Sequence, residues 1–212
     1  MNKNILYVGN QLVKSTKYTS TLETLSMFLI DEGYSVITSS DKKNKIARLL
    51  DMISSVIKHR NWTNYVLIDT YSTTNFYYAY IISQLAIIFK IKYIPILHGG
   101  NLPERLIKSK KKCDSIFNNS YKNVAPSAYL KKEFEKKGYK VTLIPNIINL
   151  KDYIFKERKK LNPKLLYVRA FATIYNPKMA VEVLKKVKEK YPKAVLCMIG
   201  PDRDGTLKEV KT

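Results

Sequence analysis

One short stretch of the sequence places a candidate catalytic histidine next to two glycines. Residues 93–103 read YIPILHGGNLP, so strand-forming side chains are followed by His98, Gly99, Gly100 and Asn101. In open α/β sheets, ligands bind outside the carboxyl ends of the strands, where glycine lets the backbone approach a ligand or turn sharply. The residues alone leave two interpretations open: a ligand-binding histidine, or a simple turn with a loop histidine.

The segments on either side of this stretch alternate between short apolar runs and amphipathic runs. Strands are expected at residues 4–9, 35–40, 65–72, 92–100, 123–126 and 140–146. Six strands alternating with helices predict an α/β fold with a doubly wound, Rossmann-like parallel sheet, because parallel neighbours need crossover connections and helices then cover both faces.

Several helix features can be predicted in detail. Ser20 and Glu23 have the spacing of a capping box, and Gly33 follows as a stop signal. Ser127 is expected to cap the helix that follows it. The helix expected at about residues 42–60 is predicted to place six apolar side chains on one face: Ile46, Leu49, Leu50, Ile53, Val56 and Ile57.

The apolar run FYYAYIISQLAIIF within residues 76–90 is the longest in the chain. It has about fourteen predominantly apolar positions, which falls short of the roughly twenty needed to span a bilayer. We therefore predict a buried helix here.

The alternation loosens after Asn146, which predicts a domain boundary. We expect an N-terminal Rossmann-like domain at residues 1–147, a linker at 148–163, and the incomplete start of a second Rossmann-like domain at 164–212. Residues 164–212 hold only two strand candidates, and two strands do not form an independently stable sheet. The apolar faces of these strands are therefore expected to be exposed.

The formal net charge is +21, from 38 Lys and Arg against 17 Asp and Glu. Such an excess attracts polyanions or an anionic membrane surface, although a lysine-rich source would give the same sum. Three of the four basic runs contain glutamate, which is typical of solvated helix faces: residues 131–137, 156–160 and 185–190. The fourth run, KSKKK at residues 108–112, is the candidate for contact with a membrane.

The two cysteines, Cys113 and Cys197, match no metal-ligand spacing and give at most one disulfide. A reducing, cytoplasmic compartment is therefore expected, with no bound metal. The apolar run near the N-terminus is too short for a signal peptide, so no export is implied.

Two other classes of protein compete for this sequence. A nicotinamide-dependent oxidoreductase would need the G-x-G-x-x-G fingerprint after the first strand, and the sequence lacks it. A basic α/β module that binds an anionic membrane surface or nucleic acid stays open as the alternative function. Specific nucleic-acid recognition is not expected, because no nucleic-acid motif and no run of interleaved aromatics accompanies the charge.

The order and spacing of the motifs resemble family 4 glycosyltransferases of the GT-B fold over essentially all 212 residues. The landmarks are NILYVGN, LHGGNLP, NVAPSAYLKKEFEKKGY before VTLIPNIIN, YVRAFATIYNPKMAVEVLKKV and LCMIGPDRDGTLKEV. The resemblance implies transfer of a sugar from a UDP- or GDP-linked donor to a glycan, lipid-linked or small-molecule acceptor, with retention at the anomeric carbon. It implies no cofactor and no metal, and a cytoplasmic enzyme that could sit on the inner face of the membrane.

The resemblance also implies roles for three side chains. His98 matches the family's cleft histidine, which contacts the transferred sugar near the anomeric carbon. Arg169 matches the arginine that neutralises the donor diphosphate, a task suited to a permanently charged, five-donor fork. Lys178 stands about one position from the family's lysine and is the second candidate for binding the donor phosphate.

The loop after the first strand departs from the family pattern, because relatives often carry paired glycines where this chain reads QLVKSTKYTS. Asn10, Ser15 and Thr16 are expected to join Gly99, Gly100 and Asn101 in lining the acceptor side of the cleft. The family's pair of glutamates, eight residues apart, is expected beyond Thr212. The 212-residue chain is therefore predicted to be inactive by itself, and its oligomeric state is left open.

Overall fold

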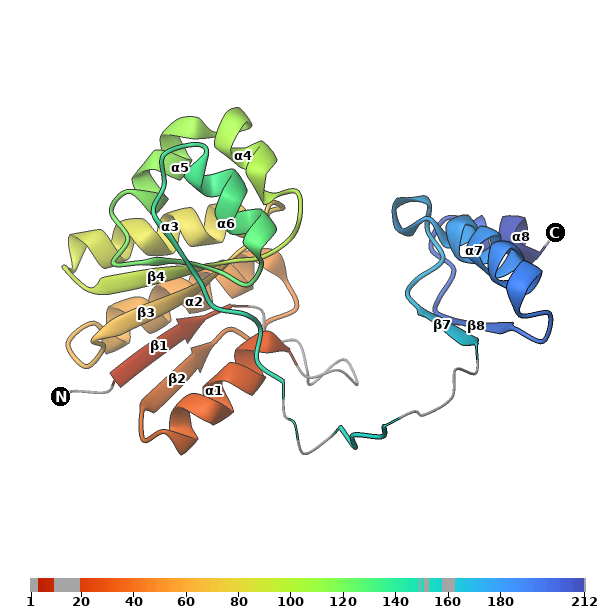
Figure 1. Cartoon of the computed structure of the whole chain (residues 1–212). Helices are drawn as coiled ribbons and strands as arrows, with labels where there is room; N and C mark the ends of the chain where they lie inside the picture. The colour runs from red at the N-terminus through yellow and green to blue at the C-terminus, as the bar shows by residue number, and fades with distance from the viewer. Residues whose placement is uncertain (1–3, 10–19, 149, 151–152, 158–162, 212) are drawn as a thin grey trace. The chain divides into compact units, whose positions relative to one another are not determined.

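The structure is a computed structural model that describes residues 4–9, 20–148, 150, 153–157 and 163–211 (Figure 1). The chain separates into two compact units, Met1–Leu150 and Lys151–Thr212. Each unit has its own parallel sheet. The exact domain and linker limits expected from the sequence stay predictions.

The first unit contains a six-stranded, wholly parallel sheet in the order β2-β1-β3-β4-β5-β6. Its elements are β1 (Asn4–Val8), α1 (Thr21–Asp31), β2 (Ser35–Ser39), α2 (Lys45–His59), β3 (Tyr65–Thr70), α3 (Asn75–Ile88), β4 (Lys92–Leu97), α4 (Leu102–Lys108), α5 (Lys110–Phe117), β5 (Asn123–Ala125), α6 (Ala128–Glu135) and β6 (Val141–Leu143). The strand order reverses between β1 and β3, which is the topological switch point where such sheets bind ligands. The predicted Rossmann-like α/β fold is confirmed.

The core of this unit lies on both faces of the sheet. Along β1, Leu6 and Val8 belong to a large cluster that includes side chains of α2 to α6, whereas Ile5 and Tyr7 belong to a smaller cluster with Leu22 of α1. Successive side chains of a strand point to opposite faces, so the two clusters mark the two faces. Burial on both sides explains why the strands are almost continuously apolar.

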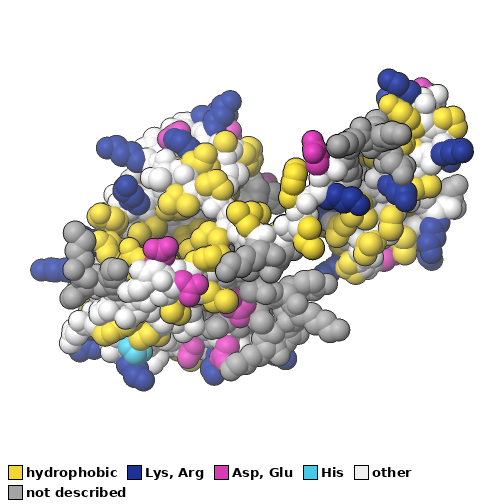
Figure 2. Space-filling model, turned by 60° about the horizontal axis from the view of Figure 1, so that its bottom comes forward, with side chains coloured by type: hydrophobic (Ala, Val, Ile, Leu, Met, Phe, Trp, Pro, Cys, Tyr) yellow, Lys and Arg dark blue, Asp and Glu magenta, His cyan; other side chains and the backbone are white. Residues whose placement is uncertain are grey.

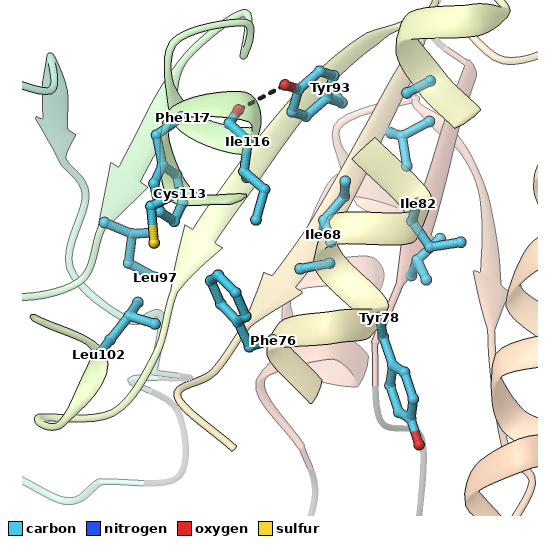
Figure 3. Packing of buried hydrophobic residues seen from close by; sticks show 14 of the residues in the cluster. Ile68, Phe76, Tyr78, Ile82, Tyr93, Leu97, Leu102, Cys113, Ile116 and Phe117 are labelled. Carbon is cyan, nitrogen blue, oxygen red and sulfur yellow. Dashed lines mark hydrogen bonds between the residues drawn. The ribbon is translucent and has the colours of Figure 1, made fainter. Parts of the chain in front are cut away.

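Helix α3 lies at the centre of the larger cluster. Figure 3 shows its Phe76 and Ile82 near Ile68 of β3, and Phe76, Tyr78 and Ile82 are all buried. In the same cluster the Tyr93 hydroxyl donates to the carbonyl of Ile116 at 2.6 Å, which satisfies a buried polar group. The predicted buried helix is confirmed, and no helix among the described residues has both the length and the apolarity to cross a membrane.

The helix caps follow the sequence signals. The N–H of Glu23 donates to Ser20 Oγ at 3.3 Å and the N–H of Ser20 donates to Glu23 Oε2 at 3.0 Å, so both halves of the capping box form. Gly33 has φ +83°, a left-handed conformation that ends α1. Ser127 Oγ accepts the N–H of Leu130 at the start of α6, as predicted.

The predicted apolar face of α2 is wrong in part. Ile46, Leu50 and Ile57 are exposed, and the buried residues of this helix are Arg48, Met52 and Val56. Arg48 is buried because its guanidinium donates to the carbonyls of Lys42 and Lys43, at 2.7 and 3.2 Å. A charged side chain with its own backbone partners therefore takes a position that hydrophobicity alone assigns to solvent.

The second unit has a two-stranded parallel sheet. Its elements are β7 (Lys164–Val168), the 3-10 turn η3 (Thr173–Tyr175), α7 (Pro177–Lys190), β8 (Val195–Ile199) and α8 (Thr206–Lys211). Helix α7 packs on the two strands. Leu166, Val168, Val195 and Ile199 are each more than half exposed. The expected exposure of apolar strand faces is confirmed.

The basic residues are spread over the surface. Figure 2 shows dark blue Lys and Arg side chains at separate places on the face in view. Four lysines of the first unit pair with carboxylates three or four positions away: Lys108 with Glu104, Lys110 with Asp114, Lys131 with Glu135 and Lys136 with Glu133. The charged residues of 131–137 are thus mostly solvated and paired with one another, and two lysines of the KSKKK run already have acidic partners.

Candidate functional site

His98 lies directly after β4, at the carboxyl edge of the six-stranded sheet. Its N–H donates to the carbonyl of Thr70 at 2.8 Å, which extends the pairing of β4 with β3 by one residue. The imidazole Nε2 lies 3.0 Å from Oδ1 of Asp69. Only 8% of His98 is exposed, so it is held within the edge of the sheet rather than on an open loop.

Asp69 joins three neighbouring strands at this edge. Its Oδ1 also accepts the hydroxyl of Tyr7 at 2.9 Å. The register explains the meeting: Tyr7 pairs with Leu67, two positions before Asp69, and Asp69 pairs with Ile96, two positions before His98. Residues two apart on a strand share a face, so all three side chains lie on the face that α1 covers.

Tyr71 covers the imidazole. Its ring stacks on His98 with centroids 4.8 Å apart and planes inclined by 19°. Burial, and secondly the negative charge of Asp69, raise the pKa of Tyr71 to about 12. The same two causes, with the hydrogen bond to Asp69, raise the pKa of Tyr7 well above its usual range. Both phenols therefore stay protonated at physiological pH, and Tyr7 acts as a neutral hydrogen-bond donor.

Gly9 leaves room for the carboxylate. A Cβ on Gly9 would lie 2.4 Å from Asp69 Oδ2 and 2.8 Å from Leu22 Cδ1. A small cavity at this place is lined by Gly9, Asp69, Tyr71 and residues of α2 and α3. The strand end is therefore filled by the carboxylate, and only glycine fits beside it.

The residues after His98 are less enclosed. Gly99 has φ +85°, and no heavy atom lies within 4 Å of a Cβ placed on Gly99 or on Gly100. Asn101 is exposed and stands at the N-cap of α4, although its side chain makes no capping bond. The other expected cleft residues, Asn10, Ser15 and Thr16, lie outside the described residues.

The predicted phosphate-binding residues lie in the second unit. Arg169 follows β7, its N–H donates to the carbonyl of Ile199 at 3.1 Å, and its guanidinium lies 4.4 Å from the ring centroid of Tyr175. Lys178 Nζ lies 2.6 Å from Glu209 Oε2, with both side chains 56% exposed. The two cations are at the carboxyl edge of β7 and the start of α7, where a helix N-terminus favours anions.

Asp204 ties together the loops at this second edge. Its Oδ2 accepts the N–H of Thr173 at 2.7 Å and the Thr173 hydroxyl at 3.0 Å, and its Oδ1 accepts the hydroxyl of Thr206. The bond from the Thr206 hydroxyl and then that from the Thr173 N–H lower the pKa of Asp204 to about 2. The loop that follows Arg169 is thereby linked to the start of α8.

Sequence reasoning missed Tyr7, Asp69 and Tyr71. The available signal was Asp69 itself, a carboxylate at the end of the otherwise apolar strand YVLIDT. A charge in such a position requires a partner. His98 was the nearest titratable candidate on the next predicted strand end.

Comparison with known proteins establishes the fold. No family model and no curated protein matches the sequence. Twelve chains of solved structures match. One is a 2.2 Å crystal structure from Listeria monocytogenes, provisionally described as a UDP-N-acetylglucosamine 2-epimerase, with a TM-score of 0.52 and 11% sequence identity. The match covers 99% of this chain and 65% of that one, so the chain spans just under two thirds of the structure whose Rossmann-like α/β architecture it shares.

Proposed function

We propose that this chain is all or part of a glycosyltransferase, an enzyme that moves a sugar from a nucleotide donor to an acceptor with retention at the anomeric carbon. The observation that carries this proposal is the buried Asp69–His98 pair at the carboxyl ends of β3 and β4, next to the switch point between β1 and β3. A fold shared with a structure described as acting on UDP-N-acetylglucosamine supports the nucleotide-sugar class. The motif order summarised above favours family 4 within that class.

In this proposal the two units have different tasks. His98, with the open backbone at Gly99 and Gly100, contacts the transferred sugar. Arg169 neutralises the donor diphosphate, because its planar fork matches phosphate oxygens in pairs. Binding both substrates supplies proximity, and the cation stabilises the charge that develops on the departing nucleoside diphosphate.

The crystal structure from Listeria supplies a second candidate, epimerisation of a nucleotide sugar at C2. A transferase needs an acceptor and releases the nucleoside diphosphate, whereas an epimerase changes the donor sugar without an acceptor. Incubating the protein expressed from its complete reading frame with UDP- and GDP-sugars, with and without acceptor glycans, separates the two. NMR of the products also reports the anomeric configuration, and an inverted product would contradict the proposal.

His98→Ala tests the site in the same assay. We expect turnover to fall by at least about a hundredfold, the usual scale for a positioned polar side chain in a reaction site. His59→Ala is the matched control. His59 is the only other histidine, and it is the last residue of α2, before the start of β3 rather than at the carboxyl end of a strand. Normal turnover of the His98→Ala protein would mean that His98 has only a structural role.

The 212-residue chain tests the donor side separately. Its second sheet has two strands, and the cations at its edge are exposed. An exposed ion pair contributes only about 0 to 1 kcal/mol. We therefore expect no micromolar binding of UDP- or GDP-sugars by calorimetric titration. Micromolar binding would show that the residues of this chain suffice to hold a donor.

A further inference from the structure

The nitrogens of His98 are in different surroundings. Nε2 faces Oδ1 of Asp69 at 3.0 Å, and this oxygen also receives the hydroxyl of Tyr7. No protein partner is found for Nδ1 among the residues that the structure describes. The direction of the Nε2 contact therefore decides which nitrogen a ligand can use.

We propose that Asp69 is a positioning residue that keeps the proton of His98 on Nε2, so that Nδ1 of the Nε2–H tautomer accepts a hydrogen bond from a sugar hydroxyl. A carboxylate is an acceptor only, so the proton of the contact must be on Nε2. In the neutral imidazole the remaining nitrogen then has a lone pair and no proton. Such a nitrogen accepts from an O–H or N–H group, and on a sugar the common group of this kind is a hydroxyl.

The surroundings of the carboxylate support this assignment. Tyr7 is fully buried, and its hydroxyl stays protonated because burial and Asp69 raise its pKa. Two donors therefore converge on Oδ1, which is stable only when this oxygen is a pure acceptor. Gly9 confines the second oxygen, since a Cβ there would lie 2.4 Å from Oδ2.

The ring plane is fixed as well. Tyr71 stacks on the imidazole at 4.8 Å with an inclination of 19°. The contact with Asp69 sets the direction in which Nε2 points, and the stack on Tyr71 sets the tilt of the ring. The imidazole therefore has one orientation before any ligand binds. Such orientation by a neighbouring acceptor is how a carboxylate acts on a histidine without touching the substrate.

This inference rests on the proposed function only for the class of ligand. The tautomer is a property of the unliganded chain and can be measured without a substrate. Because the chain contains two histidines, a long-range proton–nitrogen NMR spectrum has two imidazoles to assign, and His59→Gln identifies the signals of His98. We expect His98 as the Nε2–H tautomer, with an Nε2 proton protected from exchange with water.

Asp69→Asn tests whether the carboxylate is the cause. The amide keeps the shape but lacks the negative charge, and when turned over it presents an NH2 donor in place of Oδ1. The Nε2 proton should therefore exchange faster with water, or the Nδ1–H tautomer should appear. Asp51→Asn is the matched control, because Asp51 accepts from Ser39 at 3.2 Å and has no histidine partner. Tyr7→Phe should leave the tautomer of His98 unchanged.

Two results would overturn the inference: an Nδ1–H tautomer in the unaltered chain, or an unchanged His98 spectrum in a folded Asp69→Asn chain. If Asp69→Asn fails to fold, the spectrum of the unaltered chain still decides between the tautomers. In the complete protein, Asp69→Asn should lower kcat at least about tenfold with a smaller change in KM. An Nε2–H tautomer without any activity on nucleotide sugars would refute the proposed function and leave the inference standing.

Discussion

At the carboxyl edge of the first sheet Gly9 leaves room for the side chain of Asp69, whereas at the edge of the second sheet Gly200 leaves room for the backbone of Arg169. A Cβ would lie 2.4 Å from Asp69 Oδ2 in the first case and 1.9 Å from the Arg169 carbonyl oxygen in the second. Both strand ends require glycine. Beside Gly9 the space is occupied by a carboxylate, whereas beside Gly200 it is occupied by the backbone of the neighbouring strand end.

The side chains at the two edges also differ in burial. Asp69 and His98 are buried and bonded to each other, so their orientation is set by the fold. Arg169 has the ring of Tyr175 beside it, and Lys178 has the exposed carboxylate of Glu209. A sheet of six strands with two covered faces can bury a charge, and a sheet of two strands cannot.

The largest change in stability is expected when a buried leucine of the first sheet is truncated, in comparison with an exposed leucine of the second. Leu97 on β4 is fully buried, whereas Leu166 on β7 is 65% exposed. Leu97→Ala should reduce the free energy of unfolding by about 2–5 kcal/mol, since it leaves a cavity. Leu166→Ala should change it by about 0.5 kcal/mol or less. Urea unfolding of the first unit can be followed by Trp62, the only tryptophan, and that of the second by amide exchange. Equal losses would mean that the second sheet is covered.

Gly200→Ala should disrupt the pairing of the second sheet. The new methyl group meets a backbone carbonyl that no side-chain rotation can move away. The amide of Arg169, which donates to Ile199 at 3.1 Å, should lose its protection from hydrogen exchange. Retained protection in this variant would show that the strand ends separate at little cost.

Gly9→Ala should have a smaller effect, of about 1–3 kcal/mol, because side chains can shift to relieve the overlap. Gly100→Ala is the matched control, since its Cβ would enter open space. The urea midpoint should fall for the first variant and stay within error for the second. Equal midpoints would place the Asp69 carboxylate elsewhere.

Asp204 gives the second edge a pH dependence. Its pKa of about 2 lies below the usual carboxyl value, so its bonds to Thr206 and Thr173 are complete above that usual value and are lost as the pH falls through about 2. The amide signals of both threonines should shift over that range. Asp204→Asn should abolish the titration, and a midpoint near the usual carboxyl value would contradict these bonds.

The last prediction concerns the peripheral binding to an anionic membrane that the sequence led us to expect. Lys108, Lys110, Lys111 and Lys112 would each contribute on the order of 1 kcal/mol near such a surface. Lys108 and Lys110 have acidic partners at 2.8 and 2.6 Å, which reduces their share. Replacing all four by Gln should weaken co-sedimentation with anionic vesicles at low salt, with little difference at high salt. Unchanged binding would make the run an ordinary solvated surface.

The elements and caps could be predicted because their signals are local: period, turn glycines and the Ser20–Glu23 spacing. The burial of Arg48 could not, because it depends on carbonyls just outside α2. His98 could be predicted from its place at a strand end. Its partners could not, because Asp69 is 29 positions from His98 and Tyr7 is 62 positions from Asp69, and the contacts require the strand order β1-β3-β4. Given that order, strand alternation would have placed both on one face.

The uncovered face of the second sheet also provides a chemical label. Cys197 lies on β8 between Val195 and Ile199 and is exposed, whereas Cys113 is buried with its thiol bonded to the carbonyl of Arg105 at 3.3 Å. Burial raises the pKa of the Cys113 thiol to about 12, so it stays protonated and slow to alkylate. A thiol-reactive fluorophore should therefore attach at Cys197 alone. Its emission would report directly when another surface comes to lie against that face.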